Sequence, residues 1–136
     1  MHVEQMISAH PSAAAGFGDS LTRCIEAFFD CAQVCTACAD ACLAEPTTGS
    51  LAACIRLDLD CGDVCMTTGR VLSRQTAGHA ALKWQLLETC AGFCRLCAEE
   101  CERHASHHDH CRICADACRA CEHACHQAMS TGRVHA

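Results

Sequence analysis

Apolar positions recur at intervals of three, four and seven residues along four stretches of the chain, and cysteine occupies most of these positions. Residues 31–42, CAQVCTACADAC, hold four cysteines with alanine and polar residues between them. Each residue of an α-helix advances by about 100°, so positions at these spacings share one face, whereas a strand would scatter them over both faces. The pattern predicts four amphipathic helices, each with a stripe of thiols along one side.

Short breaks separate the four stretches. Pro46 ends the first, at about residues 18–44, and the capping residues Thr48 to Ser50 begin the second, which reaches about residue 74. QTAGHA precedes the third, at about 77–105, and SHHD separates it from the fourth. Long segments with short turns predict an all-α fold, an antiparallel up-down-up-down four-helix bundle. We expect one domain over 1–136, in which 18–130 form the Cys-lined bundle and 1–16 an extension with a short helix.

Composition changes this picture in one respect. Of the 136 residues, 17 are cysteine and 24 alanine, so few large apolar side chains remain and the thiols must help to fill the core. An odd number of cysteines rules out a complete set of intramolecular disulfides. The first residues show no secretory signal, which predicts a cytoplasmic protein with reduced thiols. A net charge of −6 argues against nucleic acid as a partner. The chain has no apolar run that approaches the roughly 20 residues of a membrane span, so we expect no membrane location.

The repeated CxxxC spacing indicates metal binding. Residues four apart on a helix have neighbouring side chains, which suits two thiolates closing on one soft ion. The plainer alternative, that cysteine serves only as a small core hydrophobe, does not explain seven repeats of one spacing. The ligand candidates are these seven pairs together with Cys24, Cys54 and Cys111: Cys31/Cys35, Cys38/Cys42, Cys61/Cys65, Cys90/Cys94, Cys97/Cys101, Cys114/Cys118 and Cys121/Cys125.

Charge favours Cu(I) among the metals that thiolates select. A monovalent ion matches a thiolate one for one, whereas Zn(II) held by four thiolates leaves −2 per buried site. Zinc sites also draw ligands from short knuckles in turns, while these cysteines lie within helices. An iron–sulfur centre needs four cysteines around one compact cluster, which suits four long stripes poorly. A zinc or general heavy-metal buffer and an iron–sulfur or thiol-redox carrier remain the alternatives.

The stripes end differently at the two ends of the predicted bundle. At one end Asp58 takes the place of a thiol, and the third stripe continues at the same angle into His104 and His108, with His107 and His110 nearby. We call this end the polar mouth and expect Asp58, His104 and His108 to be metal-binding residues where ions enter. Towards the other end the stripes continue into residues that would seal it: Phe17, Phe28, Leu72, Leu86 and Met129.

The CxxxC repeats and the His-bearing turn make the sequence resemble the bacterial copper storage proteins, in particular their cytosolic branch, over residues 18–130. The resemblance implies a four-helix bundle whose thiolates hold many Cu(I) ions, assembled as a homotetramer. We expect a role in copper homeostasis and detoxification, with a copper chaperone or acceptor protein as a further partner. No catalytic constellation stands out, so we expect a non-enzymatic store in a bundle that folds before it binds metal.

Overall fold

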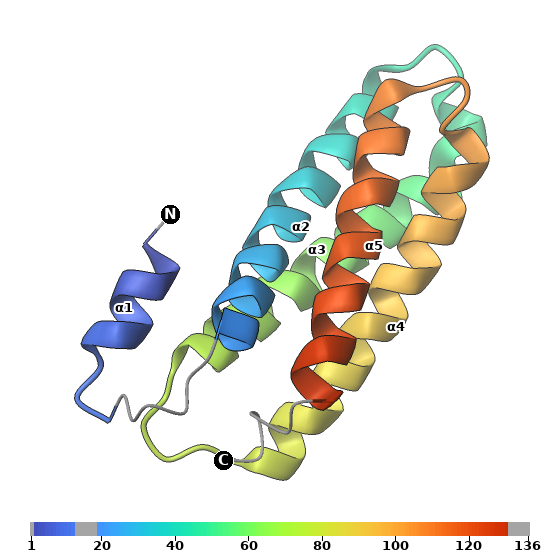
Figure 1. The fold of residues 1–136 in the computed structure, drawn as a ribbon. Coiled ribbons are helices and arrows are strands. Elements are labelled where there is room, and N and C mark those ends of the chain that lie inside the picture. The colour runs from blue at the N-terminus through green and yellow to red at the C-terminus, as the bar shows by residue number, and fades with distance from the viewer. Residues whose placement is uncertain (1, 13–18, 131–136) are drawn as a thin grey trace.

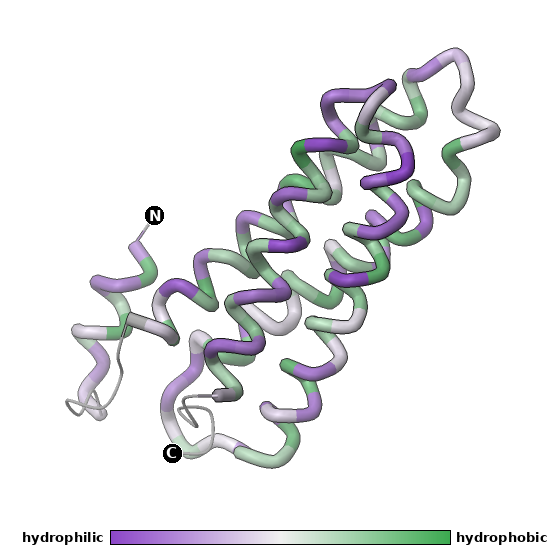
Figure 2. Tube along the Cα trace, turned by 45° about the vertical axis from the view of Figure 1, so that its right-hand side comes forward, coloured by the Kyte–Doolittle hydropathy of each residue, from purple (hydrophilic) through white to green (hydrophobic). Residues whose placement is uncertain are grey.

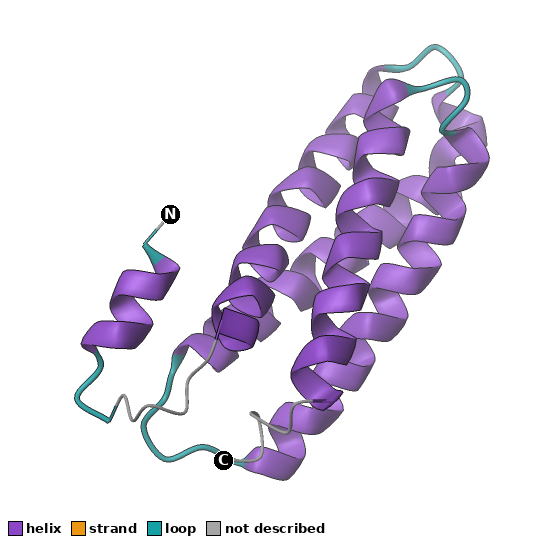
Figure 3. Ribbon diagram, viewed as in Figure 1, coloured by secondary structure: helices purple, strands orange, loops and turns teal. Residues whose placement is uncertain are grey.

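The computed structural model describes residues 2–12 and 19–130, and within them it contains helices and loops without a strand (Figure 3). The helices are α1 (Val3–Ala9), α2 (Asp19–Ala44), α3 (Ala52–Ser73), α4 (Ala80–His104) and α5 (Asp109–Ser130), and the short 3₁₀ helix η1 (Thr48–Leu51) precedes α3. The expected all-α class is confirmed, as are the four long helices and a short helix near the N-terminus.

The four long helices form a closed antiparallel ring. Each packs against the next along the chain, and α5 returns to pack against α2. The α2–α3 and α4–α5 connections lie together at one end, and the α3–α4 connection lies at the other (Figure 1). Helix α1 stands beside this ring, against α2, with Ile7 buried at the contact. The up-down-up-down bundle is therefore confirmed.

Two helix starts differ from the expected ones. No side chain caps α3, because residues 48–51 form the η1 turn and the Ser50 hydroxyl donates to the carbonyl of Thr47 (2.8 Å) instead. Helix α4 begins at Ala80, three residues later than predicted. Ala77 lies in the left-handed region, with φ of 43°, which an L-residue adopts in turns and not in a right-handed helix.

The interior is filled mainly by sulfur. All seventeen cysteines are buried, and hydrophilic and hydrophobic positions alternate around each long helix with the helical period (Figure 2). Large apolar side chains concentrate at the end that carries the α3–α4 connection, where Ile25, Phe28, Leu72 and Leu87 are buried. We call this the sealed end.

The predicted seal needs correction in α4. Leu87, and not Leu86, is the fully buried leucine there, because it lies three residues before Cys90 and shares the face of the stripe. Leu86 is half-buried and lines a surface groove of about 430 Å³ instead. Phe28 and Leu72 are buried as expected, Met129 packs half-buried against the core, and Phe17 lies outside the described residues.

One helix passes a simple test for a membrane span, which the sequence analysis did not expect. The segment Ser20–Ala44 is long and apolar enough by length and composition to cross a membrane. Five of its residues are cysteines of the stripe that faces the bundle interior, and a buried core helix satisfies the same test. The finding is weak support for a membrane location.

Gly69 of α3 packs tightly against phenylalanine side chains of α2. A Cβ atom built there would lie 3.0 Å from two ring carbons of Phe29 and 3.2 Å from the Cβ of Phe28. Gly92, in the middle of α4, differs in this respect, since an added Cβ would meet no atom within 4 Å.

These two glycines give a matched test of the packing. Gly92→Ala should stabilise the apo-protein by about 0.5–1 kcal/mol, because alanine costs less backbone entropy in a helix. Gly69→Ala gains the same propensity but forces α2 and α3 apart, and we expect a net loss of about 1 kcal/mol. Urea unfolding followed by circular dichroism measures both. Equal stabilisation by the two substitutions would contradict the tight packing of Gly69 against Phe28 and Phe29.

Candidate metal centre

The seventeen thiols lie in the bundle interior as free cysteines. Their sulfur atoms approach one another between helices as closely as within them. The Sγ atoms of Cys31 and Cys35 are 3.8 Å apart within α2, whereas Cys35 and Cys118, from α2 and α5, are 3.6 Å apart. Periodicity along each helix therefore aims the thiols inward, and packing of the four helices decides which of them become neighbours.

Several sets of four ligand atoms lie within 4.8 Å of one another. One set takes a single thiol from each long helix, Cys31, Cys65, Cys94 and Cys121. Shared members link these sets into two groups: Cys31, Cys35 and Cys118 link three sets of the first group, and Cys38 and Cys54 link two sets of the second. Further sets include Cys31/Cys35/Cys61/Cys118, Cys35/Cys97/Cys114/Cys118, Cys38/Cys42/Cys54/Cys111 and Cys38/Cys54/Asp58/Cys101. Asp58 joins the two groups, because its carboxyl group contacts Cys97 and Cys114 of the first group, and the thiols therefore form a connected array.

Burial raises the pKa of thiols at both ends of this array. Desolvation, and then the electrostatic interaction with Cys90, raises the pKa of Cys24 to about 12. Desolvation likewise raises the pKa of Cys42 to about 11, with a contribution from Cys54. No lysine or arginine is buried among the described residues, so the interior holds no fixed cation that would stabilise thiolates. Metal binding must therefore displace protons from sulfur.

Asp58 sits within the array, as its place in the stripe predicted. Its Oδ1 accepts hydrogen bonds from the thiols of Cys97 (3.2 Å), Cys114 (3.2 Å) and Cys101 (3.5 Å). Burial, and then the electrostatic interaction with Cys114, raises the pKa of Asp58 to about 10. The carboxyl group is therefore protonated at neutral pH in the metal-free protein, and binding of a cation nearby would favour its ionised form.

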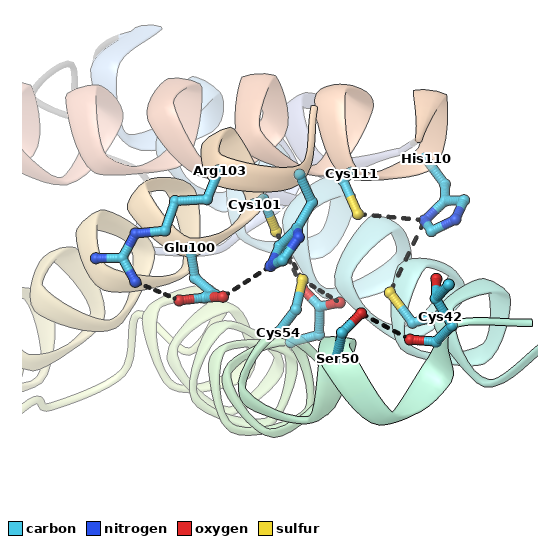
Figure 4. A network of polar contacts seen from close by, with 11 residues as sticks. Cys42, Ser50, Cys54, Glu100, Cys101, Arg103, His110 and Cys111 are labelled. Carbon is cyan, nitrogen blue, oxygen red and sulfur yellow. Dashed lines mark hydrogen bonds and ion pairs between the residues drawn. The ribbon is translucent and has the colours of Figure 1, made fainter. Parts of the chain in front are cut away.

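Among the histidines of the described residues, His110 is the one that contacts thiols. Its Nδ1 lies 3.5 Å from the Sγ of Cys38, 3.6 Å from that of Cys111 and 3.9 Å from that of Cys42. Figure 4 shows the ring of His110 with its nitrogen directed towards Cys42 and Cys111. The sequence pattern indicated only that His110 lies near the polar mouth. The signal was available, because His110 lies four residues before Cys114 and continues the α5 stripe backwards.

His104 and His108 lie at the same end but pair with carboxylates. His104 Nε2 is 2.9 Å from Glu100 Oε2, and His108 Nδ1 is 2.8 Å from Glu45 Oε2. Helix α4 ends at His104, so the angle assigned to His108 by continuing that helix does not apply. The exposed His107 follows in the turn between α4 and α5.

Two glutamates not singled out by the sequence complete this end. Glu45, just after α2, also hydrogen bonds to His110 Nε2 (2.9 Å), and this bond holds the pKa of Glu45 below its ordinary value. Glu100 binds both His104 and Arg103, as Figure 4 shows for Glu100 and Arg103. The polar mouth thus consists of Asp58 and His110 against the thiols, with His104, His108, Glu45 and Glu100 around them.

The raised pKa of Asp58 predicts how the stability of the apo-protein depends on pH. The folded form retains a proton that the unfolded chain loses above an ordinary pKa of 3.8, so stability falls as pH rises from about 4 towards 10. Asp58→Asn removes this titration and should flatten the pH dependence between about pH 5.5 and 8, with a higher melting temperature than wild type at the upper value. Thermal unfolding of reduced, metal-free protein measures it, and parallel pH profiles would contradict the assignment.

Comparison with known proteins agrees with this geometry. The family model described as copper storage protein matches residues 18–130. The structure is similar to that of the copper storage protein Ccsp from Streptomyces lividans loaded with 10 copper equivalents, with a TM-score of 0.89 and 48% identity over 94% of this chain and 98% of that one. The structure is also similar to that of a cytosolic copper storage protein from Streptomyces lividans loaded with five coppers. The TM-score is 0.81 and the sequence identity 53%, over 82% of this chain and 93% of that one.

A more distant likeness extends the comparison. The Cu(I)-bound copper storage protein BsCsp3 is 36% identical over 76% of this chain and 92% of that one, with a TM-score of 0.68. No curated protein sequence gives a significant match. The family model spans most of this chain. The alignments with the two Streptomyces lividans structures include nearly all of those chains, at about 50% sequence identity. The chain belongs to the copper storage protein family.

Proposed function

We propose that this protein stores Cu(I), holding many ions per chain through the thiolates that line its core. One observation carries the proposal, namely the connected array of overlapping four-ligand sets inside a bundle with no buried lysine or arginine among the described residues. Replacement of a thiol proton by Cu(I) leaves the charge of the interior unchanged. Zn(II) bound by the same four thiolates would leave −2 at each site, which is costly in a buried position.

The relatives support multiple occupancy. The Streptomyces lividans protein has been loaded with five and with 10 copper equivalents, and BsCsp3 binds Cu(I). All seventeen cysteines are the proposed ligands here. Overlapping sets suit Cu(I) in particular, since it accepts two or three thiolates and one sulfur can serve neighbouring ions.

The polar mouth is the proposed entrance. Soft imidazole nitrogen is a good copper ligand, and Nδ1 of His110 lies beside three thiols at this end. Asp58 lies one layer deeper, where its carboxyl group contacts Cys97, Cys101 and Cys114. His104 and His108, which line the same end, would receive ions from solvent, and the large apolar residues of the sealed end block the opposite route.

A cytoplasmic, non-catalytic role fits this chemistry. Free thiols persist where the environment is reducing, and one of the similar structures is a cytosolic copper storage protein. We propose that the protein serves copper homeostasis and detoxification, that it exchanges ions with a copper chaperone or acceptor protein, and that it assembles as a homotetramer as the family resemblance implies.

The first test is an anaerobic titration of reduced apo-protein with Cu(I) against a chromophoric chelator. Wild type should bind about as many equivalents as the 10 carried by the Streptomyces protein, or more, on a bundle that is helical before metal is added. The double variant Cys35→Ser, Cys118→Ser removes two thiols that are each shared by two sets, so it should lose several equivalents and keep its apo helicity. Binding of only one or two equivalents by wild type would refute storage.

The entrance makes a kinetic prediction. His104→Ala, His108→Ala and Asp58→Ala combined should slow the uptake of the first ions more than it lowers the final capacity, because the deeper thiols remain. Stopped-flow mixing of apo-protein with a Cu(I) complex follows the rate, and His110→Ala measured alongside shows how much of the effect belongs to the ring nearest the thiols. Identical loading curves for wild type and these variants would exclude entry through the polar mouth.

A further inference from the structure

Glu45 is a carboxylate that two histidines of the polar mouth share. Its Oε2 lies 2.9 Å from Nε2 of His110 and 2.8 Å from Nδ1 of His108, and the two rings stack with centroids 5.3 Å apart. Glu45 belongs to the connection after α2, whereas both histidines flank the start of α5. One oxygen atom therefore ties together the two connections at this end of the bundle.

The shared carboxylate fixes which ring nitrogen of His110 carries a proton. An ionised carboxylate only accepts hydrogen bonds, so the nitrogen that faces Glu45, Nε2, must be the donor. In the neutral ring Nδ1 then bears the lone pair. That atom is the one directed at Cys38, Cys42 and Cys111.

The backbone holds Glu45 in place for this contact. Its N–H donates to the carbonyl of Cys42 (3.2 Å), and its carbonyl accepts from the N–H of Thr48 (3.1 Å). Pro46 follows and narrows the conformations open to the residue before it. Cys42, a ligand candidate, and Glu45, the partner of His110, are thus held three residues apart in the same turn.

We propose that Glu45 is the positioning residue of the first Cu(I) site, holding His110 in the Nε2–H form so that its Nδ1 lone pair faces the three thiols. The inference rests on the proposed function, in which His110 and these thiols receive the entering ion. A carboxylate bonded to the outer nitrogen of a metal-binding imidazole orients the ring and makes it a better donor. Glu45 acts through His110, on the side of the ring away from the thiols.

Other histidine–carboxylate pairs of the described residues do not share this arrangement. Glu100 divides its oxygens between His104 and Arg103, and Glu122 lies 3.8 Å from the exposed His126. Among the described contacts, neither of these histidines has a thiol partner. The pair of Glu45 and His110 differs from them because the imidazole ring contacts a carboxylate with one nitrogen and thiols with the other.

The decisive experiment measures the affinity of the first Cu(I) equivalent by chelator competition. Glu45→Gln, of the same size but uncharged, should weaken that equivalent on the order of 10-fold and leave the total capacity unchanged. Glu102→Gln is the matched control, because it removes a carboxylate from an exposed ion pair with Arg119, 2.8 Å away, and should change neither quantity. An unchanged first equivalent in Glu45→Gln overturns the inference.

A double-mutant cycle shows whether Glu45 acts through His110. In a His110→Ala background, Glu45→Gln should have no further effect, and an undiminished effect there would overturn the positioning role. If His110→Ala leaves the affinity of the first Cu(I) equivalent unchanged, His110 does not bind the entering ion, and both the proposed entrance and the role of Glu45 are wrong. Should wild type bind only one or two equivalents, storage fails.

A spectroscopic readout tests the tautomer without any substitution. In apo-protein with ¹⁵N-labelled histidine, correlation spectra of the imidazole nitrogens should show His110 protonated at Nε2 and unprotonated at Nδ1. The Glu45→Ala variant should lose this preference and mix the two neutral forms. A wild-type His110 protonated at Nδ1 would overturn the inference, even if the variants had failed to fold.

Discussion

The structure depends on one constraint, namely that the groups which bind metal are also the groups that fill the core. A buried thiol packs as a small hydrophobe while it keeps its proton, and burial itself favours that state, as the raised pKa values of Cys24 and Cys42 show. The bundle can therefore close before any ion is present. The same burial then selects the cargo, because an ion that replaces a proton one for one adds no charge to an interior with no lysine or arginine among its described residues.

Antiparallel packing converts four separate stripes into shared sites. The set formed by Cys31, Cys65, Cys94 and Cys121 takes one sulfur from each long helix, so no helix could provide it alone. Metal bound there would link all four helices and stabilise the ring that they form, since a ligand that binds only the folded state shifts folding towards it. Storage capacity and fold stability are coupled through the same atoms, and a loaded protein should resist unfolding more than the apo form.

Periodicity predicted the fold and the burial of every cysteine, and it placed Asp58 within the stripe, because these properties follow from positions along a single helix. It failed where helices end or chain segments meet. The helical angle of His108 holds only if α4 continues beyond His104, where it ends. Leu86 and Leu87 both lie about one turn before Cys90, so periodicity alone does not show that Leu87 is the buried one. Glu45 carries no periodic signal, since its role depends on His110, which lies 65 residues away at the start of α5.

The two ends of the bundle give the array a direction. Asp58 and the paired histidines make one end polar, while Ile25, Phe28, Leu72 and Leu87 fill the other with side chains that offer a copper ion no ligand. In the proposed function an ion can move inward only from thiol to neighbouring thiol, and the sulfur contacts of 3.6–3.9 Å between helices provide such steps. Ions nearest the polar mouth must then leave first. The deepest thiols therefore govern long-term retention, and the mouth, with His110 held by Glu45, governs exchange.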